Sequence, residues 1–329
     1  MRRRGLVLLL VATAVASFSA GDAPAATTCS GAAVVGPHAA CAEASSGRSV
    51  TPSPATARTL PVSACAPVPA QSDPPVCTFG AAPDLATATI ALVGDSHAAQ
   101  WRGALAVVAR AKGWHGYSMA HSSCPLQLAV RDLPEPRGSL CATWKREVFA
   151  WFSHHPEVHT VFVAGLSGGT SVVATHGRSR FATSVAGYAD AWRALLPSVT
   201  RVIVIRDTPK AHIYTGTCIE RALARHQVPA RACAVPRSRA LDPDPAIAAA
   251  ASMPANRVQT VDLTRFFCGQ ADCYPVVGGV LVLRDETHMT SVFSTTLGPY
   301  LETAVDAALA RFDDADDAVR TESGQLSAN

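Results

Sequence analysis

Short apolar segments alternate with helical patterns along most of the chain, and this alternation limits the possible folds more than any other feature. Buried strands are predicted for the apolar segments 87–93, 158–164, 201–206 and 258–263, with a further short strand around 114–119. Helical patterns cover residues 98–112, 142–155, 181–196, 240–252 and 292–312. Apolar strands joined by helices are typical of a parallel sheet that is covered on both faces. The sequence therefore predicts an open α/β fold with a mostly parallel sheet.

The composition excludes two broad classes of protein. Of the 329 residues, 48% are hydrophobic and the formal net charge is +3, whereas a disordered chain has few apolar residues and a high net charge. The charge is also too close to neutral for a nucleic-acid-binding domain, and no cluster of Lys or Arg follows the first four residues. We therefore expect one folded domain over residues 86–312 and no nucleic-acid partner. The acidic segment 313–329 is expected to be a disordered tail.

The N-terminus has the pattern of a secretory signal peptide. Residues 2–4 are all arginine, residues 5–18 are largely apolar, and the small residues Ala23 and Ala25 suit a cleavage site. The alternative is a membrane anchor, but the apolar run is shorter than the ~20 residues that a spanning helix needs. We therefore expect residues 1–25 to be removed and the mature protein to be secreted or otherwise extracytoplasmic.

Ten cysteines, an even number, predict a disulfide framework in an exported chain. The simplest pairing joins neighbours along the chain: Cys29–Cys41, Cys65–Cys77, Cys124–Cys141, Cys218–Cys233 and Cys268–Cys273. A zinc site is the alternative, but the chain has no C-x-x-C spacing. The first two bridges fall within residues 26–85, a segment rich in Pro, Ser and Ala. This segment is expected to be a disulfide-stapled N-terminal arm.

The motif Gly94-Asp95-Ser96 ends the first predicted strand, at the edge of the sheet where ligands bind in open parallel sheets. Gly94 provides a tight turn, and Ser96 stands where the next helix should begin. A serine at that point has a free backbone N–H that can donate to an oxyanion, and the positive end of the helix favours the negative charge. The alternative is that Ser96 or Asp95 merely caps the helix.

The second motif, Asp285-x-x-His288, lies close before the last predicted helix. Residues three apart can meet on one helical turn, where the carboxylate would fix the imidazole tautomer. The other ring nitrogen of His288 would then be free to accept a proton from Ser96, as in a Ser-His-Asp triad. The alternative is a capping aspartate beside a surface histidine. The two motifs in this order are more specific than either one alone.

With these motifs the chain resembles the SGNH/GDSL hydrolase superfamily, and more closely the extracytoplasmic SGNH domain of acyltransferase-3 family O-acyltransferases. The likeness covers nearly the whole mature chain and includes residues 29–33, 74–80, 92–101, 123–125, 141–144, 206–209, 268–275, 278–282 and 284–290. It implies a flavodoxin-like three-layer α/β/α fold and acyl transfer, usually acetyl transfer, to cell-surface polysaccharide. It also implies Ser96 as the nucleophile, His288 as the base and Asp285 as the partner of His288. Such a mechanism requires no metal and no dissociable cofactor.

The chain departs from the superfamily in its oxyanion hole. The third sequence block of the family carries an asparagine, whereas residues 163–169 here read Val-Ala-Gly-Leu-Ser-Gly-Gly. Backbone N–H groups would then bind the oxyanion, that of Ser96 first, with Ser123, Cys124 and Gly165 as further candidates. The loss of one such donor lowers a rate by about 10²–10³.

A second departure is expected at the N-terminus, where the predicted signal peptide takes the place of the membrane acyltransferase half of the family. Either a separate membrane acyltransferase supplies the acyl group for a carbohydrate acceptor, or water is the acceptor and the enzyme is an esterase. We expect an acyl-serine enzyme that transfers or removes acyl groups on cell-envelope carbohydrate. The alternative is a catalytically idle SGNH scaffold that binds glycan or is a partner of a membrane acyltransferase.

Several other polar residues have open interpretations. His97 is expected either to help bind substrate or to pack at the start of the helix, and Asp207 is expected mainly to form a turn. The histidines within 154–159 favour a solvated loop over a metal site, because no carboxylate has ligand spacing with them. The basic loop of about 210–240 is expected to be a lid or a specificity insertion.

Overall fold

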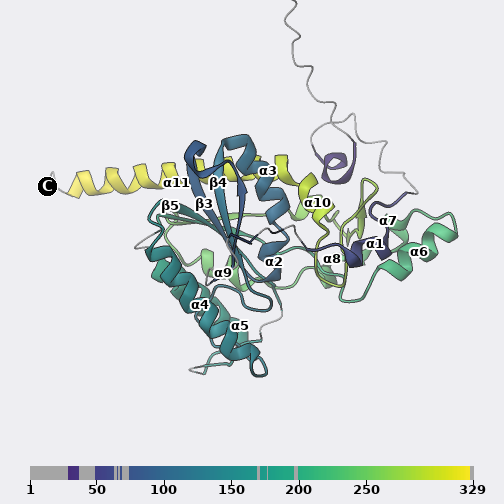
Figure 1. Ribbon diagram of the computed structural model, residues 1–329, viewed down its shortest axis with the longest axis horizontal. Helices are drawn as coiled ribbons and strands as arrows, with labels where there is room; N and C mark the ends of the chain where they lie inside the picture. Colours follow the sequence, from purple (N-terminus) through teal and green to yellow (C-terminus); the bar gives the residue numbers. More distant parts are fainter. Residues whose placement is uncertain are drawn as a thin grey trace, which may run out of the picture.

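A seven-stranded sheet forms the centre of the computed structural model, which describes residues 29–36, 49–62, 65, 67–68, 74–168, 171–175, 177–195 and 199–326 (Figure 1). Its strands, in spatial order, are β1 (Pro67–Val68), β2 (Val76–Gly80), β4 (Trp114–Ala120), β3 (Ala88–Gly94), β5 (Val158–Ala164), β6 (Arg201–Ile205) and β8 (Val258–Val261). The strands from β4 to β8 in this order are parallel, whereas β2 pairs antiparallel with β4 and with β1. The parallel part has the strand order of a flavodoxin-like fold, which confirms the predicted fold class.

Helices cover both faces of the sheet and give the fold three layers. One face is covered by α3 (Arg102–Lys112) and α11 (Gly298–Leu326), and the other by α4 (Arg137–Ser153), α5 (Arg180–Leu195) and α9 (Pro245–Ala250). Successive side chains of β3 enter different cores: Ile90 and Leu92 pack on the α3 and α11 side, whereas Ala91 and Val93 pack on the other. Because both faces are buried, the strand is an unbroken apolar run.

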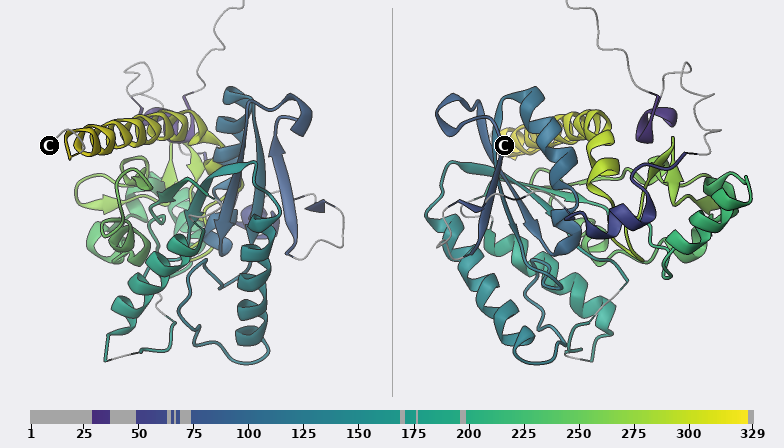
Figure 2. Two further views of the ribbon diagram at one scale, coloured as in Figure 1. Left: turned by 90° about the vertical axis from the view of Figure 1, so that its left-hand side faces the viewer. Right: turned by 45° about the vertical axis from the view of Figure 1, so that its right-hand side comes forward.

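A smaller lobe lies to one side of the sheet (Figures 1 and 2). Its elements are α1 (Pro54–Thr59), α6 (Gly216–Ala224), α7 (Pro229–Ala232), α8 (Arg237–Ala240), β7 (Val235–Pro236), β9 (Asp272–Cys273), β10 (Val276–Val277) and β11 (Val280–Leu281). Among the described residues, short 3-10 helices also lie at Gly31–Val34, Pro83–Leu85 and Thr264–Phe266. Part of the lobe has a core of its own that includes Ala57, Ile219 and Leu281. Because α6, α7 and α8 all lie within residues 210–240, the predicted basic loop is largely helical.

Two predictions about the ends of the domain are wrong. Residues 76–80, which were assigned to the arm, form β2 and pair with β4 in the central sheet. The acidic segment from Asp313, which was expected to be disordered, continues α11 to its end. Arg201 Nη2 donates to Asp313 Oδ1 at 2.6 Å, and Asn256 Nδ2 donates to Asp316 Oδ1 at 3.0 Å. These contacts attach the acidic part of the helix to the body of the domain.

Four disulfide bonds join Cys65 to Cys77, Cys124 to Cys141, Cys218 to Cys233 and Cys268 to Cys273. They are four of the five neighbouring pairs that the sequence suggested. The fifth, Cys29–Cys41, includes a residue outside the described part of the chain, and the predicted signal peptide also lies outside it. Within the residues that the structure describes, no helix is long and apolar enough to cross a membrane.

Candidate active site

The turn from β3 into α2 (Ser96–Ala99) places Ser96 at the carboxyl edge of the sheet. At Gly94 a Cβ atom would run into the carbonyl oxygen of Ala164, because β3 and β5 end side by side. Asp95 is the cap of α2: its Oδ1 accepts the N–H of His97 at 2.8 Å, and its Oδ2 accepts the N–H of Leu166 at 3.0 Å. Since Asp95 caps the helix, the hydroxyl of Ser96 is left for another partner.

The Asp285–His288 motif lies in a tight loop rather than on the helical turn that was predicted. Leu283 and Met289 form an antiparallel bridge at the base of the loop. Inside it, Asp285 Oδ1 accepts the N–H groups of Thr287 at 2.9 Å and of His288 at 2.7 Å. The carboxylate thus shapes its own loop, as aspartates do in Asx turns, and in doing so it fixes the backbone of His288.

Ser96, His288 and Asp285 form a continuous chain of hydrogen bonds. His288 Nε2 lies 2.8 Å from Ser96 Oγ, and His288 Nδ1 lies 2.9 Å from Asp285 Oδ2. When Nδ1 carries the proton and donates it to Asp285, Nε2 accepts the hydroxyl proton of Ser96. Partial burial would raise the pKa of Asp285, but the hydrogen bonds from His288 and Thr287 outweigh it and lower this pKa to about 2. The carboxylate is therefore charged at neutral pH.

A second His–Asp pair lies directly behind the first. His97 Nδ1 and Asp207 Oδ1 are 2.6 Å apart, both side chains are only 1% exposed, and the rings of His97 and His288 are 4.9 Å apart. Asp207 Oδ2 also accepts the N–H of Ser167 at 2.7 Å and its hydroxyl at 2.8 Å. The pair thus joins α2 to the loops that follow β5 and β6.

Opposing effects decide the ionisation of this buried pair. Burial would lower the pKa of His97, but the charge of Asp207, the hydrogen bond to it and the charge of Asp95 raise this pKa overall. Burial would raise the pKa of Asp207, but the charge and hydrogen bond of His97 and the charge of Lys210 lower this pKa overall. Both shifts favour an imidazolium paired with a carboxylate.

Gln100 connects the two His–Asp pairs through one fully buried amide. Its Oε1 accepts the N–H of Met289, next to His288, at 2.7 Å. Its Nε2 donates to Thr208 Oγ1, next to Asp207, at 3.1 Å. Neither Gln100 nor the His97–Asp207 pair was predicted as part of the site. The sequence feature that could have indicated the pair is the position of Asp207, which lies shortly after the carboxyl end of β6, on the sheet edge that carries Ser96.

The loop after β4 contains two of the candidate oxyanion donors. The N–H of His121 donates to Gly94 O at 3.1 Å, which places this loop against the turn before Ser96. The N–H of Cys124 donates to His121 O at 3.0 Å. Because this N–H is already used inside the loop, the prediction of Cys124 as an oxyanion donor is corrected. Ser123 has a positive φ of 61°, which is uncommon for a residue other than glycine. Of the two, the N–H of Ser123 is the one left as a candidate.

Gly165 lies under the site, directly after β5. A Cβ atom added at Gly165 would be 2.8 Å from the hydroxyl of Tyr188 and 3.2 Å from the Cβ of Pro125. The missing side chain therefore lets the loop after β4 pack against β5 and α5. Gly165 remains a candidate donor on the grounds of this position.

The sequence matches a family model described as "SGNH domain (fused to AT3 domains)" over residues 64–303, a range that contains both motifs and the whole central sheet. The chain belongs to the SGNH family. No curated protein matches the sequence of this SGNH chain. Among solved structures, it is similar to the periplasmic domain of a lipopolysaccharide acetyltransferase from Salmonella ser. Paratyphi A, with 15% identity and a TM-score of 0.50. The match covers 66% of this chain and 84% of that domain, and at this identity it concerns the fold alone.

Two of the histidines from the segment 154–159 make local contacts with the end of α4. His154 and His155 end α4, where their Nδ1 atoms bond the carbonyls of Ala150 and Trp151. Within the described residues, no group of three or more His, Cys, Asp or Glu side chains is placed to hold a metal ion. Trp101 and Trp144 are buried in the two cores beside the sheet.

Proposed function

We propose that this SGNH chain catalyses acyl transfer through Ser96, with His288 as the general base and Asp285 as the group that orients His288. The observation that carries the proposal is the 2.8 Å contact between Ser96 Oγ and His288 Nε2, on an imidazole already held by Asp285. A nucleophile within hydrogen-bond reach of a base that a third group orients is the geometry that activates a serine.

In the acylation step, Ser96 Oγ attacks the carbonyl carbon of an ester while its proton moves to His288 Nε2. The tetrahedral intermediate carries the negative charge on the former carbonyl oxygen. His288 then returns the proton to the leaving oxygen, the carbon–oxygen bond to the leaving group breaks, and an acyl-Ser96 ester remains. Asp285 stabilises the imidazolium during this step without taking up the proton itself.

Backbone N–H groups are the proposed stabilisers of the oxyanion, because residues 163–169 contain no asparagine. Ser96 is the first residue of α2, so its N–H has no partner within the helix. The N–H of Ser123 and that of Gly165 are the proposed further donors. Preorganised donors of this kind contribute more to rate than any other single effect in many enzymes.

In the deacylation step, an acceptor hydroxyl gives its proton to His288 and attacks the acyl carbon; the bond from that carbon to Ser96 Oγ then breaks, and His288 returns the proton to Ser96 Oγ. A carbohydrate hydroxyl as acceptor makes the protein an O-acyltransferase, and water makes it an esterase. We propose envelope carbohydrate as the substrate, acetyl as the acyl group and a separate membrane acyltransferase as the source of that group. The family, whose model describes fusion to AT3 domains, and the lipopolysaccharide acetyltransferase with a similar fold support this choice.

An extracytoplasmic location is part of the proposal. The four disulfide bonds of the described residues suit an oxidising compartment, and residues 1–25 have the composition of a signal peptide. The solved structure with a similar fold is itself a periplasmic domain.

The test is turnover of p-nitrophenyl acetate by the oxidised protein, beside a Ser96→Ala variant and with or without a polysaccharide acceptor. We expect turnover that disappears in Ser96→Ala and is kept in Ser153→Ala, a matched change at an exposed serine at the end of α4. Faster release of nitrophenolate with the acceptor favours transfer over hydrolysis. A folded protein with no turnover and no labelling by a fluorophosphonate probe would instead be an idle scaffold that binds glycan.

A double substitution tests whether the residues act together. His288→Ala and Ser96→Ala should each lower kcat by roughly 10⁴-fold or more, and the double variant should lose little beyond either single one. Losses that multiply in the double variant would mean that Ser96 and His288 do not work in one step.

A further inference from the structure

A hollow of about 420 Å³ lies between the loop after β4 and the first half of α4, and the proposed reaction does not use it. Arg131, Lys145 and Arg146 line it, against a single carboxylate, that of Glu135. The carboxylate of Glu135 is itself engaged, because it accepts the N–H of Ser139 at 3.2 Å. The volume is within the range of small-ligand sites. The hollow is thus open and carries an excess of positive charge.

Lys145 is the buried cation of this hollow, with 8% of its surface exposed. Its Nζ donates to the carbonyls of Gln127 and Ala129, each at 3.0 Å. Among the described residues no carboxylate pairs with it, whereas each of the other two lysines of the chain has an aspartate partner. Burial and the nearby charge of Arg131 lower the pKa of Lys145 to about 8. A buried charge without a counter-charge is costly, so an anion in the hollow would be stabilised.

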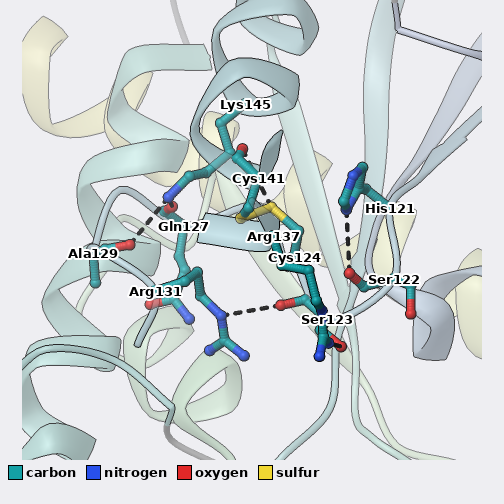
Figure 3. Close-up of a disulfide and its surroundings, with 10 residues drawn as sticks. All are labelled: His121, Ser122, Ser123, Cys124, Gln127, Ala129, Arg131, Arg137, Cys141 and Lys145. Carbon is teal, nitrogen blue, oxygen red and sulfur yellow. Dashed lines mark hydrogen bonds between the residues drawn. A yellow bond between two sulfur atoms is a disulfide. The ribbon is translucent and has the colours of Figure 1, made fainter. Parts of the chain in front are cut away.

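Arg131 is a second partly buried cation, and it forms no ion pair among the described residues. Its Nε donates to Ser123 O at 3.1 Å, and no carboxylate of the described residues pairs with its guanidinium group. Figure 3 shows Arg131 and Lys145 beside the Cys124–Cys141 disulfide, which joins the loop to α4. The unused N–H groups of a guanidinium suit the two oxygens of a carboxylate or a phosphate.

The hollow adjoins the loop that lies against the candidate active site. Arg131 holds the carbonyl of Ser123, and the N–H of His121 in the same loop donates to Gly94 O beside Ser96. The charge of Arg131 is also close enough to Asp95 for the two to interact. A polymer acceptor bound at Ser96 could therefore place a neighbouring sugar in the hollow.

Exposed apolar side chains also line the hollow. Leu128 is 46% exposed and Val130 is 62% exposed, and both line the hollow together with Phe149. Large apolar side chains this exposed next to buried cations suit a ligand with an apolar face and a charged group. A sugar ring with a carboxylate or phosphate substituent has this combination.

We propose that this hollow is an acceptor subsite that binds a negatively charged group, a carboxylate or a phosphate, on the carbohydrate. The anion lies between Lys145 and Arg131, and the sugar ring that bears it contacts Leu128 and Val130. This inference rests on the proposed function for the identity of the acceptor, but the anion site itself does not depend on acyl transfer.

The direct test uses the three lysines, Lys112, Lys145 and Lys210, as probes. The mature protein is labelled with ¹³Cε-lysine, and the Lys145 signal is assigned by its absence in Lys145→Met. Titration with glucuronate is expected to shift the Lys145 signal saturably and to leave Lys112 unchanged, while glucose shifts neither. A parallel titration with inorganic phosphate distinguishes the two anion sources by their Kd values. No saturable shift at Lys145, or an equal shift with glucose, would overturn the inference.

Matched arginine variants locate the site. Arg131→Gln is expected to weaken glucuronate binding at least about tenfold, since a hydrogen bond to a charged group is lost, whereas Arg110→Gln at an exposed position on α3 leaves the Kd unchanged. If Arg131→Gln does not fold, Arg146→Gln at an exposed position should still weaken binding about two- to fivefold. An unchanged Kd in the folded Arg131 and Arg146 variants contradicts the site.

The experiments distinguish a failure of the anion subsite from a failure of the proposed acyl-transfer function. Turnover of p-nitrophenyl acetate without a lysine shift leaves the acyl-serine mechanism standing and removes the subsite. A Lys145 shift in a protein without turnover keeps the anion site and removes the mechanism. With both present, an acidic oligosaccharide acceptor should have a KM about tenfold lower than its neutral counterpart, and Arg131→Gln should abolish the difference.

Discussion

Two His–Asp pairs with rings 4.9 Å apart have nearly the same chemistry and opposite surroundings. In the outer pair, His288 is 25% exposed and Asp285 is 34% exposed, and the free ring nitrogen of His288 faces Ser96 Oγ. In the inner pair both side chains are 1% exposed, and Nε2 of His97 has no hydrogen-bond partner among the described residues. The outer imidazole can exchange a proton with Ser96 Oγ. Nε2 of the inner imidazole has no partner among the described residues that could accept its proton.

The difference teaches that access, rather than residue type, separates a group that moves protons from one that holds a structure. The inner pair receives additional hydrogen bonds from Ser167 and from the N–H of Thr208, so its carboxylate is fully used. It fixes the start of α2, and with it the position of Ser96. In the proposed mechanism, proton transfer therefore belongs to His288, and we propose a positioning role for His97 and Asp207.

The largest expected effect is that substitutions of the two carboxylates act mainly on different quantities, kcat for Asp285 and the free energy of unfolding for Asp207. Asp285→Asn should lower kcat by roughly 10³–10⁴-fold, because the imidazole loses the partner that fixes its tautomer, and should lower the free energy of unfolding by only about 1–2 kcal/mol, because the amide keeps an acceptor oxygen for the loop. Asp207→Asn should lower the free energy of unfolding by about 3–5 kcal/mol, because it leaves His97 without its buried counter-charge. Esterase kinetics and urea denaturation measure the two effects.

Asp190→Asn is the matched control for this comparison, because Asp190 forms an exposed ion pair with Arg193. It should change neither quantity appreciably. If Asp207→Asn were as stable as the wild type, the inner pair would not hold the structure, and the contrast between the two pairs would fail.

Gln100→Ala tests the connection between the two pairs and should have an intermediate effect. The substitution leaves the buried N–H of Met289 without its acceptor, so we expect a loss of about 1–3 kcal/mol in the free energy of unfolding. Since Met289 follows His288 directly, kcat should also fall, by about tenfold, with little change in KM. Gln100→Glu keeps the acceptor and should recover part of the stability; equal losses in both variants would argue against this hydrogen bond as the cause.

The smallest effect concerns the acid stability of the outer pair. The pKa of Asp285 is about 2 in the folded protein and ~3.9 in an unfolded chain, so its contribution to stability is present above about pH 4 and is lost as the pH falls through about 2. Denaturation midpoints of the wild type and Asp285→Asn should therefore converge between roughly pH 5 and pH 2. A gap that widens with acidification would contradict the lowered pKa of Asp285.

The sequence predicted the parallel sheet well because its central strands β3, β5 and β6 are mostly buried and rich in apolar residues. It failed for β2, whose residues 76–80 lie in a segment rich in proline and serine and pair antiparallel with the short edge strand β1 and with β4. It also failed for the segment after Asp313, where acidic composition suggested disorder. There, contacts from Arg201 and Asn256, which lie far away in the sequence, hold the helix in place.

Each of the two motifs was predictable because its residues lie close together in sequence, and the order of the motifs with the family resemblance paired Ser96 with His288, 192 residues away. Asp95 and Ser96 are neighbours, and Asp285 is three residues from His288, so local spacing was sufficient. The His97–Asp207 pair spans 110 residues and depends on which loops meet at the carboxyl edge of the sheet. A single sequence does not contain that information, and the buried environment that ionises the pair exists only in the folded protein.

The most direct test of the central claim is to trap the covalent intermediate. The oxidised protein is mixed with p-nitrophenyl acetate, quenched with acid during the initial burst and digested, and the peptide that carries Ser96 is examined by mass spectrometry. We predict one added acetyl group on Ser96 in the wild type, none in Ser96→Ala and none in His288→Ala within the burst. Nitrophenol release without acetyl-Ser96, or an acetyl group on another residue that persists in Ser96→Ala, would contradict the acyl-serine mechanism.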